Sequence, residues 1–178
     1  MEKVIVIING TGGSGKDTFI DFVKKYAKVV NVSSVDFVKE VATLAGWQGE
    51  KSDEARKFLS DLKVIMTAYN DGPFRSIASS VEKFRNSDSD IMFIHIRELE
   101  NIKRAVDSFG AYTLLVKREG LENISTNYSD ANVDNYAYDF YVENNTLEGL
   151  DKSAELFVRN FDKSHHYART LKPLDDIE

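Results

Sequence analysis

The chain has 178 residues and a mass of 20.2 kDa, and 42% of its residues are hydrophobic, which is typical of one globular domain. Its 23 lysines and arginines are outnumbered by 29 aspartates and glutamates, so the formal net charge of -6 argues against a nucleic-acid partner. The absence of cysteine excludes disulfides, thiolate metal sites and cysteine nucleophiles. No bilayer-spanning apolar run or secretory signal is visible, so we expect a cytoplasmic protein without a membrane partner.

The first elements in chain order are a strand and a helix joined by glycines. Val4–Ile8 is an unbroken apolar run, typical of a strand buried on both faces of a parallel sheet. Glycines cluster in the next segment, and apolar residues from Phe19 to Tyr26 then recur at helical spacing. These residues predict a strand, a glycine loop and a helix.

Strands and helices alternate through the rest of the chain. The helix that begins at Asp53 has an apolar stripe that we expect to face the core, and a polar stretch at about 117–136 predicts a lid with helical parts. Alternation of this kind predicts a doubly wound α/β domain with its ligand site at the carboxyl ends of the strands. Further strands are expected at 28–32, 91–96, 111–116 and 138–142, and further helices at 37–44, 74–84, 98–108 and 147–161.

The glycine loop fits the pattern G-x-x-x-x-G-K, and it lies between a buried strand and a helix start, as a phosphate-binding loop requires. Glycines let the backbone approach phosphate closely, backbone N–H groups supply positive potential, and Lys16 reaches the β and γ phosphates. The alternative is a glycine-rich turn that only connects the two elements. The nucleotide-binding residues expected are Gly10, Thr11, Gly12, Gly13, Ser14, Gly15, Lys16, Asp17 and Thr18.

The end of the loop, Ser14-Gly15-Lys16-Asp17-Thr18, has Asp17 where Ser or Thr normally binds magnesium. It resembles the Ser-Gly-Lys-Asp branch of P-loop nucleotide kinases, seen in phage-type deoxynucleoside monophosphate kinases and animal-type phosphomevalonate kinases. Two shorter segments extend the resemblance: 94–98, where phage-type enzymes carry Asp-x-Arg, and 138–144, similar to the last strand and Asn of these kinases and of dephospho-coenzyme A kinases.

The resemblance implies a single P-loop NTPase domain over 1–178, with a five-stranded parallel sheet flanked by helices. An acceptor-binding helical insertion at about 36–86 and a lid at about 117–136 complete it. The cofactors implied are ATP and Mg²⁺, and the partner is a phosphorylated small-molecule acceptor. No oligomeric state is favoured.

Phosphoryl transfer depends on positioning and charge neutralisation, so arginines in the right segments are the next candidates. Arg97 follows a strand expected beside the phosphate loop, and Arg118 closes another strand at the lid entrance. With Lys16 they form the expected catalytic set, although each arginine is also compatible with an ordinary polar strand end. Acceptor binding is expected at Asp36, Arg56, Arg75 and Arg97, and magnesium binding at Asp17 and Asp36, where solvated helix faces or a helix cap are the alternatives.

His95 departs from the pattern, because the Walker-B position usually supplies an Asp that organises magnesium-bound water. Either Asp17 and Asp36 carry the metal or turnover is weak. The leading hypothesis is ATP-dependent phosphoryl transfer to a nucleoside or deoxynucleoside monophosphate. The alternatives are a kinase of a non-nucleotide phosphorylated compound and a catalytically weak nucleotide-binding regulatory protein.

Overall fold

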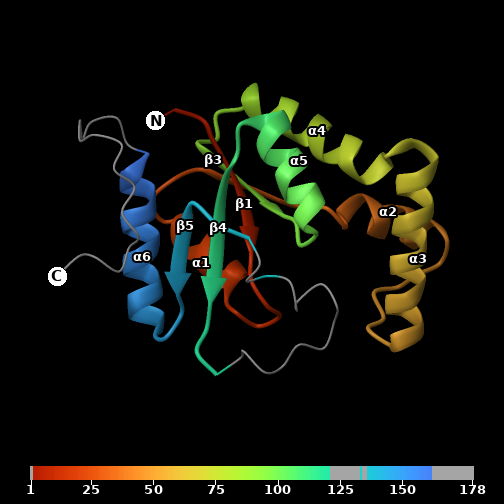
Figure 1. Ribbon diagram of the computed structural model, residues 1–178, viewed down its shortest axis with the longest axis horizontal. Helices are drawn as coiled ribbons and strands as arrows, with labels where there is room; N and C mark the ends of the chain where they lie inside the picture. Colours follow the sequence, from red (N-terminus) through yellow and green to blue (C-terminus); the bar gives the residue numbers. More distant parts are fainter. Residues whose placement is uncertain (1, 121–132, 134–135, 162–178) are drawn as a thin grey trace. The chain divides into compact units, whose positions relative to one another are not determined.

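The computed structural model describes residues 2–120, 133 and 136–161, and the chain divides into two compact units (Figure 1). The sheet unit contains the chain up to Asn31 and from Asp88 on, and the helical unit is Val32–Ser87. In chain order the described elements are β1 (Val4–Asn9), α1 (Lys16–Val23), β2 (Val29–Ser33), α2 (Asp36–Leu44), α3 (Asp53–Asn70), α4 (Gly72–Arg85), β3 (Ile91–His95), α5 (Leu99–Phe109), β4 (Tyr112–Lys117), β5 (Phe140–Glu143) and α6 (Leu147–Asn160).

The five described strands form one parallel sheet in the order β2-β3-β1-β4-β5. β1 lies between β3 and β4, and Val6 is in register with Phe93 on one side and Tyr112 on the other. The arrowheads of β1 and β4 point to the same edge of the sheet in Figure 1. A parallel sheet flanked by helices confirms the predicted α/β class and explains why the run Val4–Ile8 in the central strand β1 is continuously apolar.

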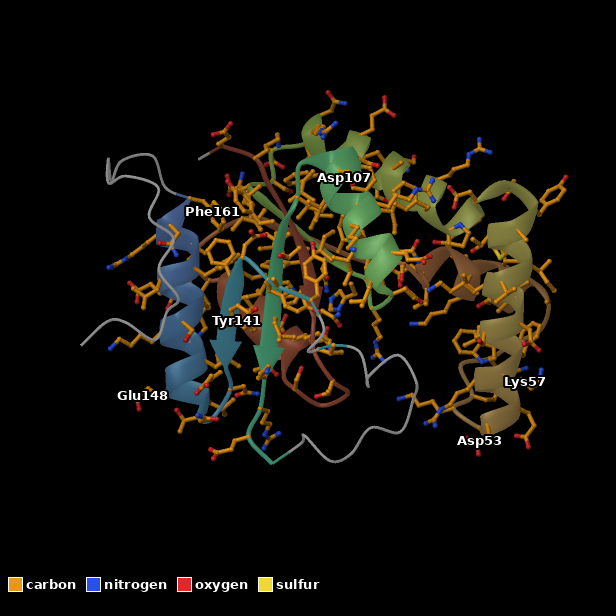
Figure 2. All side chains as sticks on the ribbon, in the orientation of Figure 1. Asp53, Lys57, Asp107, Tyr141, Glu148 and Phe161 are labelled. Atoms are coloured by element: carbon orange, nitrogen blue, oxygen red, sulfur yellow. The ribbon has the colours of Figure 1, made fainter. Side chains whose placement is uncertain are left out.

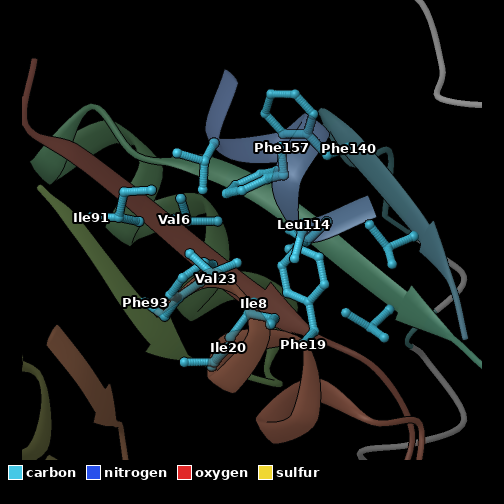
Figure 3. Close-up of a cluster of buried hydrophobic side chains, with 14 of the residues drawn as sticks. Val6, Ile8, Phe19, Ile20, Val23, Ile91, Phe93, Leu114, Phe140 and Phe157 are labelled. Atoms are coloured by element: carbon cyan, nitrogen blue, oxygen red, sulfur yellow. The ribbon is translucent and has the colours of Figure 1, made fainter. Parts of the chain in front are cut away.

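Helices cover both faces of the sheet, which buries β1 completely. Residues Val4–Ile8 are each 7% exposed or less. α1 and α6 cover one face, where Phe19 meets Phe93 and Phe157 edge to face, with ring centroids 6.3 and 5.6 Å apart (Figure 3). α5 covers the other face and buries Ile102 and Ala105. The main core therefore supports the strand that leads into the glycine loop.

In the helical unit, α3 contacts α2 and α4 but has no buried residue of its own. Its apolar stripe is only partly covered: Leu59, Leu62 and Met66 are half-buried, while Ile65 is 64% and Tyr69 85% exposed. This corrects the expectation that the whole stripe faces the core. Charged side chains such as Asp53 and Lys57 also extend from this helix (Figure 2). Ser52 starts α3 through its side chain, which accepts a hydrogen bond from the backbone N–H of Ala55.

The sole tryptophan, Trp47, also belongs to the helical unit and is half-buried in the turn between α2 and α3. Its indole N–H donates to the Glu50 carbonyl at 3.2 Å, so the ring packs against its own turn. None of the helices in the described parts of the chain has the length and hydropathy needed to span a membrane.

Candidate functional site

The loop between β1 and α1 has a backbone that requires glycine at particular positions. Gly10, Gly13 and Gly15 have φ angles of 146°, 79° and 96°. A Cβ at position 10 would collide with the Val116 carbonyl oxygen, and one at position 15 would collide with the Asn144 side chain. A Cβ at Gly12 would meet nothing within 4 Å. Two of the predicted loop glycines are thus required both by conformation and by space.

Lys16 folds its ammonium group over this loop. Its Nζ donates to the carbonyl oxygens of Gly10 at 2.6 Å and Thr11 at 2.9 Å, and it lies 3.5 Å from Ser14 Oγ. Lys16 also begins α1, with Gly15 as the N-cap. The loop therefore combines a lysine cation with a helix N-terminus, whose first backbone N–H groups lack intrahelical acceptors.

Asn144, just beyond β5, holds the loop from the side. Its Nδ2 donates to the Ser14 carbonyl at 2.9 Å, while its backbone N–H donates to the Lys117 carbonyl at 2.7 Å. The same side chain occupies the space beside Gly15. Asn144 thus links the ends of β4 and β5 to the loop. The sequence signalled this residue by its position after a strand and by the resemblance of 138–144, but it did not predict the contact with the loop.

A buried polar network lies behind the loop, and sequence reasoning missed it. Asn9, which is 1% exposed, accepts a hydrogen bond from Gly10 N–H at 2.8 Å and donates to the Tyr138 hydroxyl at 2.9 Å. The hydroxyl donates onward to the Val133 carbonyl at 3.0 Å. A polar residue at the end of an apolar strand was the available signal. The network fixes the start of the loop through satisfied buried groups.

The chain just before β5 is anchored by further side chains. Asp139 Oδ2 accepts from both the backbone N–H and the hydroxyl of Thr113, each at 2.8 Å. Burial raises the pKa of Tyr136, and the nearby Asp139 and Asp107 carboxylates raise it further. The phenol of Tyr136 is therefore neutral at physiological pH.

His95 ends β3 in register with Ile8 of β1, the residue before Asn9. Its Nε2 lies 2.9 Å from Asn31 Oδ1 and 3.8 Å from Asp17 Oδ1. The His95 side chain is 19% exposed and that of Asp17 is 87% exposed. The fold thus joins three polar side chains from β2, β3 and α1, although the sequence predicted a site role only for Asp17.

Three other predicted site residues belong to the sheet unit: Arg97, Arg118 and Thr18. Arg97 and Arg118 are exposed and follow β3 and β4, the two neighbours of β1, at the carboxyl edge of the sheet that also carries the loop. Thr18 is half-buried in the first turn of α1. Residues 121–132 and 134–135 of the expected lid lie outside the described residues.

The remaining predicted acceptor residues belong to the helical unit, and their approach to the loop stays a prediction. Arg56 is exposed on α3, 3.7 Å from the Asp53 carboxylate, and Arg75 is exposed in the first turns of α4. Asp36 is also exposed, and its Oδ2 accepts a 2.6 Å hydrogen bond from the Ser33 backbone. This bond joins the end of β2 to the first residue of α2.

Comparison with solved structures agrees with this architecture. The chain is similar to the protein TT1252 from Thermus thermophilus, with a TM-score of 0.53 and 17% identity over 91% of this chain and 100% of that one. It is also similar to thymidylate kinase from Ehrlichia chaffeensis, at a TM-score of 0.41 and 12% identity over 89% and 100% of the two chains. The likeness to TT1252 supports the α/β fold with a five-stranded parallel sheet.

No protein-family model matches the sequence. No curated protein matches it either.

Proposed function

We propose that this protein is a kinase that transfers the γ-phosphoryl group of ATP to a nucleoside or deoxynucleoside monophosphate. The observation that carries the proposal is the loop at the end of β1, where Lys16 Nζ contacts the Gly10 and Thr11 carbonyls beside the start of α1. A glycine loop with this lysine at the carboxyl edge of a parallel sheet suits a polyphosphate.

In this proposal Lys16 turns from the loop carbonyls to the β and γ phosphates, because a phosphate oxygen is a stronger acceptor for an ammonium group than a neutral carbonyl. The bond from the γ phosphorus to the β–γ bridging oxygen breaks as an acceptor phosphate oxygen bonds to that phosphorus. ADP and a nucleoside diphosphate are the products. Arg97 and Arg118 would neutralise charge on the transferred group, and Asp36, Arg56 and Arg75 would bind the acceptor.

The negative charge of Asp17 favours a divalent cation at this site when a polyphosphate is bound. The Asp17 carboxylate lies in the first turn of α1, where it repels a polyphosphate unless a cation stands between the two. Asp17 would hold Mg²⁺, which screens the phosphate charges when bound. The donor set near Asp17 fits magnesium only in part, since the neighbouring His95 offers nitrogen and Mg²⁺ prefers oxygen ligands.

The test is an assay of acceptor-dependent ADP release with every ribo- and deoxyribonucleoside monophosphate. Lys16→Ala should lower the rate by at least ~10²-fold, since it removes a donor to developing charge. Lys24→Ala is the matched control, because Lys24 is exposed near the end of the same helix and pairs with Asp21. If no monophosphate accelerates ADP release, the proposed substrate class is wrong.

One observation favours a second candidate, a nucleotide-binding protein with weak turnover. His95 stands where a Walker-B carboxylate is expected, and its Nε2 faces Asn31 and Asp17. This candidate predicts that ATP raises the melting temperature while no acceptor gives turnover. Full profiling that includes non-nucleotide phosphorylated compounds separates it from a kinase of another acceptor.

A further inference from the structure

The polar cluster beside the loop consists of three side chains, and each offers a different kind of atom that can bind a metal ion. His95 contributes an imidazole nitrogen, Asn31 an amide oxygen and Asp17 a carboxylate oxygen, and they come from β3, β2 and α1. His95 is in register with Ile8 of β1, and Ile8 comes one residue before the end of the strand that leads into the loop. All three residues belong to the sheet unit, so this cluster is independent of the helical unit.

The distances from His95 Nε2 to the two oxygen donors suit a shared metal ion. His95 Nε2 is 2.9 Å from Asn31 Oδ1 and 3.8 Å from Asp17 Oδ1. Two donor atoms that each lie about 2.1 Å from one ion are about 3 to 4 Å apart at common coordination angles. Water and phosphate oxygens would supply the remaining ligands.

The chemistry of the donors decides which ion. Magnesium takes oxygen ligands and keeps much of its water, whereas imidazole binds first-row transition metals well. His95 stands where a carboxylate is expected, so the cluster offers a nitrogen donor in place of an oxygen donor. This difference lowers the affinity of the cluster for Mg²⁺ relative to transition-metal cations. We propose that His95, Asp17 and Asn31 form a divalent-metal site that prefers transition-metal cations such as Mn²⁺ or Co²⁺ to Mg²⁺. The proposal rests on the proposed function in one respect, since the ion would accompany a polyphosphate in the loop.

The deciding measurement is pulsed electron paramagnetic resonance of Mn²⁺ bound to the full chain with inorganic tripolyphosphate, a probe that contains no nitrogen. Directly bound imidazole gives a ¹⁴N modulation, so the experiment reports whether His95 touches the ion. The sequence has three histidines, and His165 and His166 lie outside the described residues. A double variant, His165→Gln with His166→Gln, should keep the modulation, whereas His95→Gln should abolish it.

Affinity measurements by titration complete the test. His95→Gln should weaken Mn²⁺ binding by at least ~10-fold, because even outer partners of metal ligands are worth that much. His95→Asp should lower the preference for Mn²⁺ over Mg²⁺ by a similar factor, since it makes the three donors all oxygen. Asp17→Asn is a second variant at an 87% exposed side chain, where folding is not at risk, and it should weaken binding while the ¹⁴N modulation persists.

An oxygen-only Mn²⁺ spectrum in the unmodified protein, or no Mn²⁺ binding, would overturn the metal proposal. These results leave the kinase proposal standing if magnesium-dependent turnover is seen. Conversely, a ¹⁴N signal without turnover on any acceptor would support the metal site and reject the kinase. The two proposals therefore fail in different ways.

Discussion

Helix α6 of the sheet unit and helix α3 of the helical unit carry similar apolar stripes, but only α6 buries its stripe. α6 buries Leu150, Ala154 and Phe157 against the sheet, whereas Ile65 and Tyr69 of α3 stay largely exposed. A sheet face offers a broad apolar surface, while the main contacts of α3 within its unit are with the two helices α2 and α4. Helical periodicity therefore predicts which face of a helix is apolar, and the neighbouring elements decide whether that face is buried.

The largest expected effect compares one phenylalanine from each unit. Phe157 is fully buried among Phe19, Phe93 and Phe140, so Phe157→Ala should lower the free energy of unfolding by about 3–5 kcal/mol. Phe58 on α3 is 39% exposed, and Phe58→Ala should cost less than about 1 kcal/mol. Urea unfolding measures both free energies, and equal losses would contradict the contrast between α6 and α3.

The buried network behind the loop gives the next largest effect. Tyr138→Phe removes the hydroxyl that pairs with Asn9 and Val133, and an unsatisfied buried amide costs about 1–3 kcal/mol. Tyr26→Phe is the matched control, because the Tyr26 hydroxyl donates to Asp151 at the surface. Thermal unfolding of both variants should show a clear loss for Tyr138→Phe, and a larger loss for Tyr26→Phe would rule out our view of the network.

A pair of helix caps compares the units more finely. Thr146 caps α6 and Ser52 caps α3, each by accepting a backbone N–H, and loss of such a cap costs about 1 kcal/mol. Thr146→Ala should lower global stability because α6 is part of the core. Ser52→Ala should mainly speed hydrogen exchange in α3, which has no buried residue. Mass-spectrometric exchange distinguishes these outcomes, and uniform loss of protection in both variants would argue for one cooperative unit.

The smallest effect concerns the ion pair where the chain leaves and re-enters the sheet unit. The hydrogen bond from Lys28, at 2.7 Å, lowers the pKa of Asp88, and the same bond raises the pKa of Lys28. The contribution of Asp88 is present above its unfolded pKa and is lost as pH falls through its folded pKa. Asp88→Asn should therefore slightly reduce the loss of stability in acid. Both groups are exposed, so melting temperatures should differ little.

Local signals predicted much of this protein. The glycine loop, the five strands and the helices follow from apolar runs, periodicity and glycine spacing. The contacts that the sequence did not predict are long-range. Asn9 and Tyr138, for example, are 129 positions apart, and only the fold brings them together. The cluster at His95 likewise depends on the strand order, which places β3 between β2 and β1.

Trp47 gives this molecule a built-in optical probe. It is the sole tryptophan and belongs to the helical unit, while the sheet unit contains many tyrosines and phenylalanines but no tryptophan. Tryptophan fluorescence excited at long wavelength therefore follows the helical unit alone, whereas far-ultraviolet circular dichroism follows both units. Coincident transitions in the two signals would mean that the units unfold together. An earlier fluorescence transition would mean that the helices open while the phosphate loop stays folded.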